Sequence, residues 1–303
     1  MSTPSTAPTD GTRQIDVRRP DARVLRVHDD GEPGDDRVPL VLHHGTPQSG
    51  LVLRAQLEDA RQRGLRVVAY DRPGYGGSDR SPGRSVADAA DDVARIADVL
   101  GFERFVTSGS SGGGPHALAC AVRLPDRVAA VATVAGVAPH DAGGLDWTAG
   151  MGDDNVVEFG AAVAGEEALE PVLANGRTMV VGSTPETLMD GMATLLPPAD
   201  VAALRAGLGR WLHESMSAGL ATSYDGWMDD DLAFVRDWGF DLADLHAPAL
   251  VLAGGADLMV PVAHGEWLAA HLPGAERLVD AEAGHLSLMG DPARAHAWLL
   301  SRW

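Results

Sequence analysis

Ser111 is the residue whose setting most clearly predicts chemistry. Gly109 and Gly113 stand two positions to either side of it, so the segment GSSGG fits the pattern G-x-S-x-G. A serine on a tight strand-to-helix turn needs such small neighbours, because larger side chains would collide where strand and helix converge. We therefore predict that Ser111 is a nucleophile. Ser110 as the nucleophile, or an ordinary glycine-serine turn, are the alternatives.

A nucleophilic serine needs a general base, and the base needs a carboxylate to orient it. Of the eleven histidines, His285 is favoured because it follows a weak strand pattern in a short loop before the last helix. Asp257 is the predicted carboxylate, since it lies just beyond a Gly-Gly turn that ends an apolar run. Asp141, after the apolar run 128–134, is the alternative. The chain order Ser111, Asp257, His285 is the order of the G-x-S-x-G enzymes.

Negative charge that develops on a reacting carbonyl oxygen needs backbone donors. We assign this role to the N–H groups of Thr46, in the loop after the run VPLVLH, and of Gly112, which follows the nucleophile. Pro47 stiffens this loop. His43 and His44 should point to opposite faces of a strand, so they make poor joint metal ligands. The sequence predicts no metal and no organic cofactor.

These residues need a scaffold, and the sequence predicts a doubly wound, mostly parallel α/β sheet. Nearly continuous apolar runs are typical of strands covered on both faces. They alternate with helical patterns at 85–100, 113–124, 261–272 and 291–303. The strand candidates are 38–43, 65–70, 104–108, 128–134 and 249–253, with weaker ones at 22–28 and 276–280.

The alternation stops between about residues 139 and 246, where helical patterns are broken by glycine and proline. We therefore predict a core of residues 15–138 and 247–303, an inserted helical cap (lid) at 139–246, and a disordered polar tail at 1–14. The cap should lie over the carboxyl ends of the strands, where such sheets bind ligands.

Aromatic side chains in and near this insertion indicate an apolar pocket or, equally, the small core of the cap itself. The acidic run 229–231 is most often a solvated face or a helix N-terminus, and a contact to a cationic substrate is the alternative. The expected pocket residues are His44, Trp147, Trp211, Tyr224 and Trp227.

Composition excludes several other classes of function. The 303 residues carry 43 acidic and 24 basic side chains, for a net charge of −19, so a nucleic-acid partner is not expected. Every basic residue is arginine, which excludes a Walker A loop, a pyridoxal Schiff base and a kinase active site. The single cysteine, Cys120, cannot form an intrachain disulfide. With no apolar leader and no apolar run of membrane length, we expect a cytoplasmic protein that does not associate with membranes.

The chain resembles the α/β-hydrolase superfamily over nearly its whole length. The resemblance is carried by HGTP (44–47), DRPGYGGSD (71–79), GSSGG (109–113), GGAD (254–257) and GH (284–285). The inserted cap resembles the lid of the subgroup that contains proline iminopeptidases and related esterases. Proline iminopeptidases usually carry HGGPG and a bulky residue after the serine, whereas this chain has HGTPQ and Gly112. Dehalogenases and epoxide hydrolases use an aspartate nucleophile where this chain has Ser111.

The resemblance implies a serine hydrolase that cleaves a carboxylic ester of a small, apolar molecule through an acyl-enzyme intermediate. An aminopeptidase or amidase like the proline iminopeptidases is the first alternative, and a hydrolytic carbon–carbon lyase is another. A non-catalytic ligand-binding relative of the fold is the alternative from a different class. The sequence leaves the physiological substrate and the oligomeric state open.

Overall fold

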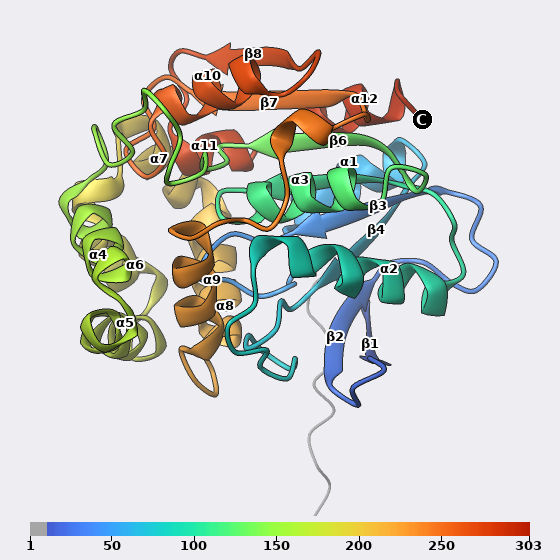
Figure 1. The fold of residues 1–303 in the computed structure, drawn as a ribbon. Helices are drawn as coiled ribbons and strands as arrows, with labels where there is room; N and C mark the ends of the chain where they lie inside the picture. Colours follow the sequence, from blue (N-terminus) through green and yellow to red (C-terminus); the bar gives the residue numbers. More distant parts are fainter. Residues whose placement is uncertain (1–10) are drawn as a thin grey trace, which may run out of the picture.

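The computed structural model describes residues 11–303, and its eight strands form one sheet in the order β1-β2-β4-β3-β5-β6-β7-β8 (Figure 1). The strands β3 to β8 run parallel to one another, while β2 pairs antiparallel with β1 and β4. This confirms the doubly wound, mostly parallel sheet. The bounds are β1 Arg13–Arg18, β2 Val24–Asp29, β3 Val38–His43, β4 Leu65–Tyr70, β5 Phe105–Ser110, β6 Val128–Val134, β7 Ala249–Gly254 and β8 Glu276–Asp280.

Both faces of the central strands are buried, which is why their sequences are nearly continuous apolar runs. Successive residues alternate between two cores: Leu40 and Val67 belong to one, and Val41 and Val68 to the other. Helices α1 and α12 cover the first face, and α2, α3 and α10 cover the second. Their bounds are α1 Arg54–Gln62, α2 Ala89–Leu100, α3 Gly113–Arg123, α10 Val262–His271 and α12 Ala293–Leu300.

Between β6 and β7 all of the regular secondary structure is helical. Its helices gather at one end of the sheet, on the left in Figure 1. Short helical turns at Ala193–Leu195 and Leu204–Leu208 lie between these helices, and one at Leu242–Asp244 lies between the last helix and β7. The longer elements are α4 Asp153–Ala164, α5 Glu166–Val181, α6 Pro185–Gly191, α7 Pro198–Ala203, α8 Gly209–Gly219 and α9 Asp225–Phe234.

The prediction of a disordered tail over residues 1–14 is wrong for its last residues. Residues 1–10 lie outside the described part of the chain, but Arg13 and Gln14 open β1 and pair with Asp29 and His28 of β2. The sequence of β1 looks polar because this strand forms an edge of the sheet: Val17 packs into the core while its neighbours face outward.

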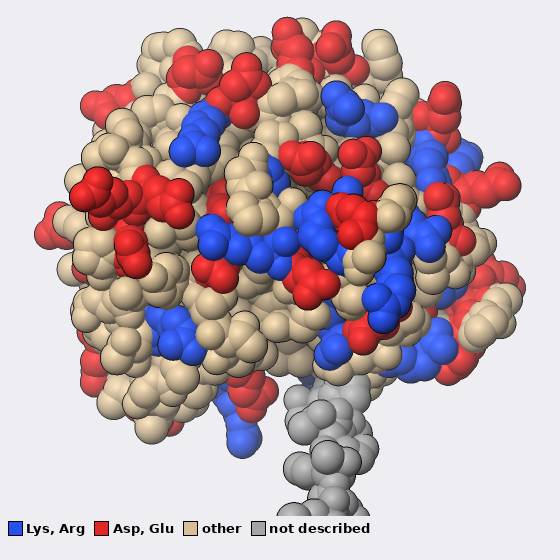
Figure 2. Space-filling view, turned by 60° about the horizontal axis from the view of Figure 1, so that its bottom comes forward, with Lys and Arg blue, Asp and Glu red and all other residues tan. Residues whose placement is uncertain are grey.

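Charges of both signs share the surface next to this edge. Figure 2 shows basic side chains beside acidic ones, and the strand pair β1–β2 carries ion pairs such as Arg26–Asp16 at 2.6 Å. Across residues 11–303, none of the helices combines the length and apolar character needed to cross a membrane.

Candidate active site

The strand β5 ends at a strained turn that holds Ser111. The residue has a φ of 53°, in the left-handed region that side chains other than glycine rarely adopt. A methyl group on Gly109 would lie 2.0 Å from the carbonyl oxygen of Gly113, and one on Gly113 would lie 2.2 Å from that of His43. The close approach predicted for the two glycines is therefore present. Strain of this kind is common at functional sites, where the surrounding packing enforces it.

His285 and Asp257 lie at the carboxyl ends of β8 and β7 and contact each other. The ring Nδ1 of His285 is 2.8 Å from Oδ2 of Asp257, and both side chains are buried. The other oxygen of Asp257 accepts the backbone N–H groups of Met259 and Val260 at 2.8 Å. Because the carboxylate accepts from Nδ1–H, the Nε2 atom of the ring is the one left to accept a proton. The alternative acid, Asp141, is exposed.

The pKa of His285 lies above its ordinary value. Burial of the ring lowers this pKa, but the negative charge of Asp257, its hydrogen bond and the nearby Asp200 together outweigh burial. Asp200 also accepts the N–H and the hydroxyl of Ser287 at 2.8 Å, which fixes the short helix α11, His285–Met289. Sequence reasoning missed Asp200, since an acid in the first turn of α7 gives no signal of a contact 87 residues away in the chain.

Thr46 and Gly112, the expected oxyanion donors, face each other. A methyl group on Gly112 would lie 2.4 Å from the Thr46 hydroxyl oxygen. Gly112 also precedes the first turn of α3, whose N–H groups are not used by the helix itself. Arg72 stabilises the loop after β3 by donating hydrogen bonds to the carbonyl oxygens of His44 and Gly45.

The acidic run 229–231 is buried, so its interpretation as a solvated face or helix N-terminus is wrong. Asp230 accepts hydrogen bonds from Arg72 at 2.6 Å, Arg84 at 2.6 Å, Tyr75 at 2.8 Å and Thr46 at 2.8 Å. Burial raises the pKa of Asp230, but the two guanidinium groups outweigh it and hold the pKa well below its usual range. This cluster ties α9 to the loop after β3 and to the turn after β4.

A cavity of about 570 Å³ lies between the carboxyl ends of the strands and the inserted helices. Ser111, Gly112, Thr46 and His285 line it from the sheet side, and Trp227 lines it from α9. Its wall is mainly apolar, with leucine, valine and methionine side chains. Ser111 and His285 share the cavity but are not hydrogen-bonded to each other in the described structure. Catalytic hydrogen bonds are often long before substrate binds.

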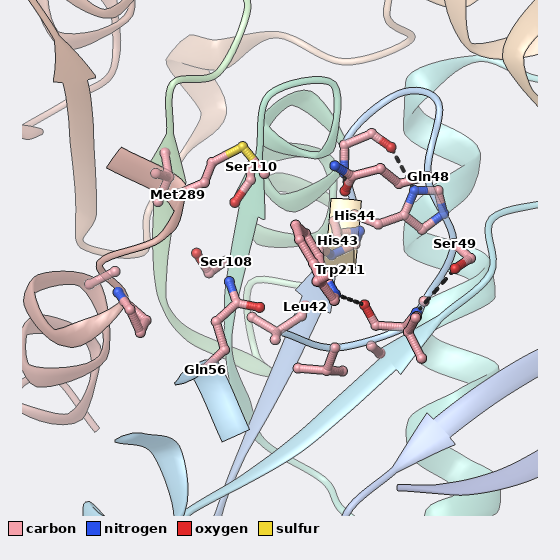
Figure 3. A pocket seen from close by; sticks show the side chains of 18 of the residues that line it. Leu42, His43, His44, Gln48, Ser49, Gln56, Ser108, Ser110, Trp211 and Met289 are labelled. Atoms are coloured by element: carbon pink, nitrogen blue, oxygen red, sulfur yellow. Dashed lines mark hydrogen bonds between the residues drawn. The ribbon is translucent and has the colours of Figure 1, made fainter. Parts of the chain in front are cut away.

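Of the five expected pocket residues, Trp227 lines this cavity and the other four do not. Figure 3 shows His44 and Trp211 in a separate pocket of about 50 Å³ that also contains Ser110, and Trp211 donates to the carbonyl of Leu51. Trp147 is buried and donates to the carbonyl of Ala138. Tyr224 donates to the exposed carboxylate of Glu170. Aromatic composition could not separate pocket walls from packing, because both need large apolar surfaces.

No group of three or more histidine, cysteine, aspartate or glutamate side chains within residues 11–303 is arranged to hold a metal ion. Cys120 is buried, as its apolar helical setting predicts.

The sequence profile of the alpha/beta hydrolase fold matches residues 38–292, which is most of the chain. The chain belongs to this family. The match spans the elbow, the aspartate after β7, the histidine after β8 and the inserted helices.

Curated relatives are similar over most of their length. A bifunctional esterase/perhydrolase from Acinetobacter calcoaceticus is 28% identical, covering 75% of this chain and 76% of its own. An epoxide hydrolase A from Mycobacterium tuberculosis is 28% identical, covering 91% and 92%. A thermophilic esterase from Thermogutta terrifontis has the same fold, with a TM-score of 0.70 at 23% identity over 96% of this chain and 99% of its own. The family and the two curated relatives support a hydrolase, and the Thermogutta structure shows the shared fold.

Gly113→Ala should destabilise the protein by at least about 1–3 kcal/mol, because the new methyl group meets the backbone of His43 and His44 rather than a movable side chain. Gly160→Ala is the matched control: this glycine lies in α4 with open space around it, so alanine should add about 0.5–1 kcal/mol of stability. Chemical denaturation of the two variants and the parent measures both. Equal stability of the two variants would contradict the steric account of the elbow.

Asp230→Asn should lower the free energy of unfolding by about 3–5 kcal/mol, since it leaves two buried guanidinium groups without their countercharge. The control is Glu58→Gln, which breaks the exposed ion pair with Arg54 and should leave the unfolding midpoint unchanged. Urea unfolding followed by circular dichroism gives both values. A stability loss no larger in Asp230→Asn than in the control would show that the cluster does not hold these segments together.

Proposed function

We propose that this hydrolase cleaves carboxylic esters through an acyl-enzyme formed on Ser111. The observation that carries the proposal is the buried hydrogen bond of 2.8 Å between His285 and Asp257 on the wall of the cavity that Ser111 also lines. A serine, an oriented imidazole and a carboxylate in this order are the parts that acyl transfer requires.

His285 takes the proton from the Ser111 hydroxyl as the oxygen attacks the ester carbonyl, and then gives it to the leaving alcohol. Asp257 holds the proton on Nδ1 and stabilises the imidazolium that forms. The N–H groups of Thr46 and Gly112 stabilise the oxyanion. Water attacks the acyl-enzyme with His285 again as base, which returns the free serine and releases the acid.

The inserted helices act as a cap over this site. Side chains of α4, α5 and α9 line the same cavity as Ser111, so substrate is enclosed between the cap and the strand ends. The mainly apolar wall favours an ester with an apolar body. A cap also excludes water, which strengthens the electrostatic contribution of the oxyanion donors.

Ser111→Ala should lower kcat/KM for short p-nitrophenyl esters on the order of 10⁴-fold or more, because no other group replaces the nucleophile. The fold should survive, since alanine removes one oxygen from a half-buried side chain. Ester hydrolysis and labelling by a fluorophosphonate probe are the two measurements. Turnover retained in the variant would refute the nucleophile. An unlabelled parent protein would instead favour a non-catalytic binder.

The acid limb of the pH–kcat/KM profile should have its midpoint above about 6.5, the ordinary histidine pKa. The base must be neutral, and a raised pKa keeps His285 protonated to higher pH, so activity is lost as the pH falls through that raised value. Asp257→Asn removes the negative charge and the charged hydrogen bond that raise this pKa, while burial, which lowers it, and the smaller contribution of Asp200 remain. The midpoint should therefore move down, and the rate should fall on the order of 10⁴-fold.

The matched control for this profile is Asp141→Asn, which removes an exposed carboxylate that does not contact His285. Its profile should coincide with that of the parent. An identical midpoint in the parent and in Asp257→Asn would contradict the assignment of Asp257 as the orienting acid.

A further inference from the structure

Two carboxyl groups of the cap meet on the cavity wall. Glu158 comes from α4 and Asp231 from α9, and both line the cavity that contains Ser111. Asp231 is fully buried, and both of its oxygens lack a donor among the described residues. Its neighbour is the carboxyl of Glu158, and two carboxyls can hydrogen-bond to each other only when they share a proton. Glu158 itself accepts the indole N–H of Trp227 at 2.9 Å.

The two carboxyl groups lack a countercharge from the residues that line the described cavity. Burial raises the pKa of both carboxyls, and the charge of Glu158 raises that of Asp231 further, because the described residues supply no cation to favour their ionised forms. No arginine lines the described cavity, and the chain has no lysine. The nearby Arg72 and Arg84 are already paired with Asp230.

The carboxyl pair and the candidate catalytic base respond to different charges. The charges that act on His285 are those of Asp257 and Asp200, whereas those that act on Asp231 are Glu158 and Asp230. The cavity is thus lined by Ser111 and His285 from the strand ends, by Glu158 and Asp231 from α4 and α9, and by an apolar wall that includes Val157 and Met216.

We infer that Glu158 and Asp231 form a subsite for a protonated amine, so that the substrate is an ester whose apolar body carries an ammonium group. An ammonium N–H placed there would give the buried carboxyl of Asp231 the donor that it lacks, and its positive charge would stabilise the ionised form of the pair. A substrate with a carboxylate at that subsite would meet repulsion instead. This inference rests on the proposed function, since it assigns another part of the same cavity.

The test uses isosteric ester pairs. Butyrates of dimethylaminoalkanols of increasing chain length are each compared with the hydrocarbon ester in which a CH group replaces the ammonium nitrogen. Methyl esters of dimethylamino acids and of the matching branched acids place the charge on the acyl side. At the chain length that spans the cavity, the amine member should have at least about tenfold higher kcat/KM, as expected for hydrogen bonds to a charged group.

Asp231→Asn and Glu158→Gln should each lower the ratio of kcat/KM within a pair by roughly ten- to a hundredfold. In Glu158→Gln the amide oxygen can still accept the indole N–H of Trp227, so this variant should fold. It tests the subsite if Asp231→Asn does not fold. Glu170→Gln is the matched control, because it removes one exposed carboxylate of the cap that does not line the cavity. Its ratio should equal that of the parent.

Binding is measured separately, by calorimetry on Ser111→Ala with the same ester pairs. Tighter binding of the amine members, abolished by adding Asp231→Asn, supports the subsite even if the parent hydrolyses neither ester, in which case the proposed function alone fails. Equal affinities within every pair, or a preference that survives both carboxyl variants, would overturn the subsite. Hydrolysis of both members at equal rates would overturn it as well and leave the esterase proposal standing.

Discussion

The carboxylate of Asp230 carries a full negative charge out of contact with water, and several segments meet to compensate it. Arg72 and Arg84 reach it directly, while Tyr75 and Thr46 donate hydroxyl groups to it. A buried charge without partners costs several kcal/mol, so each of these segments is fixed relative to α9. The loop that presents the candidate oxyanion donors is therefore held from the cap side as well as by the sheet. One buried ion-pair cluster thus joins α9 to the loop after β3 and to the turn after β4.

Asp231, the next residue of α9, lies in different surroundings, and its pKa is shifted in the opposite direction from that of Asp230. Asp231 points away from the arginines and toward Glu158, because consecutive residues of a helix face directions about 100° apart. Asp230 is held ionised by its guanidinium partners, whereas burial and a like charge raise the pKa of Asp231. One turn of α9 thus contributes a structural anchor on one side and an acidic cavity wall on the other.

Much of the fold could be predicted because its physical causes are local. The runs 38–43, 65–70 and 128–134 are strands with the predicted bounds, since burial on both faces selects unbroken apolar sequence. The edge strand Arg13–Arg18 was missed because only one of its faces is buried. Of the aromatic residues predicted for the pocket, Trp147 and Trp211 do not line the cavity that contains Ser111, because composition does not encode which side of a helix meets a cavity.

The sequence by itself determined the elbow around Ser111, since its steric requirement falls on residues two positions away and is written in adjacent glycines. It also placed Asp257 and His285 after strands, so that a parallel sheet brings them to one edge whatever the details of packing. Only the tertiary structure decided that Asp230 pairs with two arginines about 150 residues away and that Asp231 shares a wall with Glu158. Those contacts depend on how α4 and α9 dock, and the free energy of a buried charge depends on its three-dimensional surroundings rather than on its neighbours in the chain.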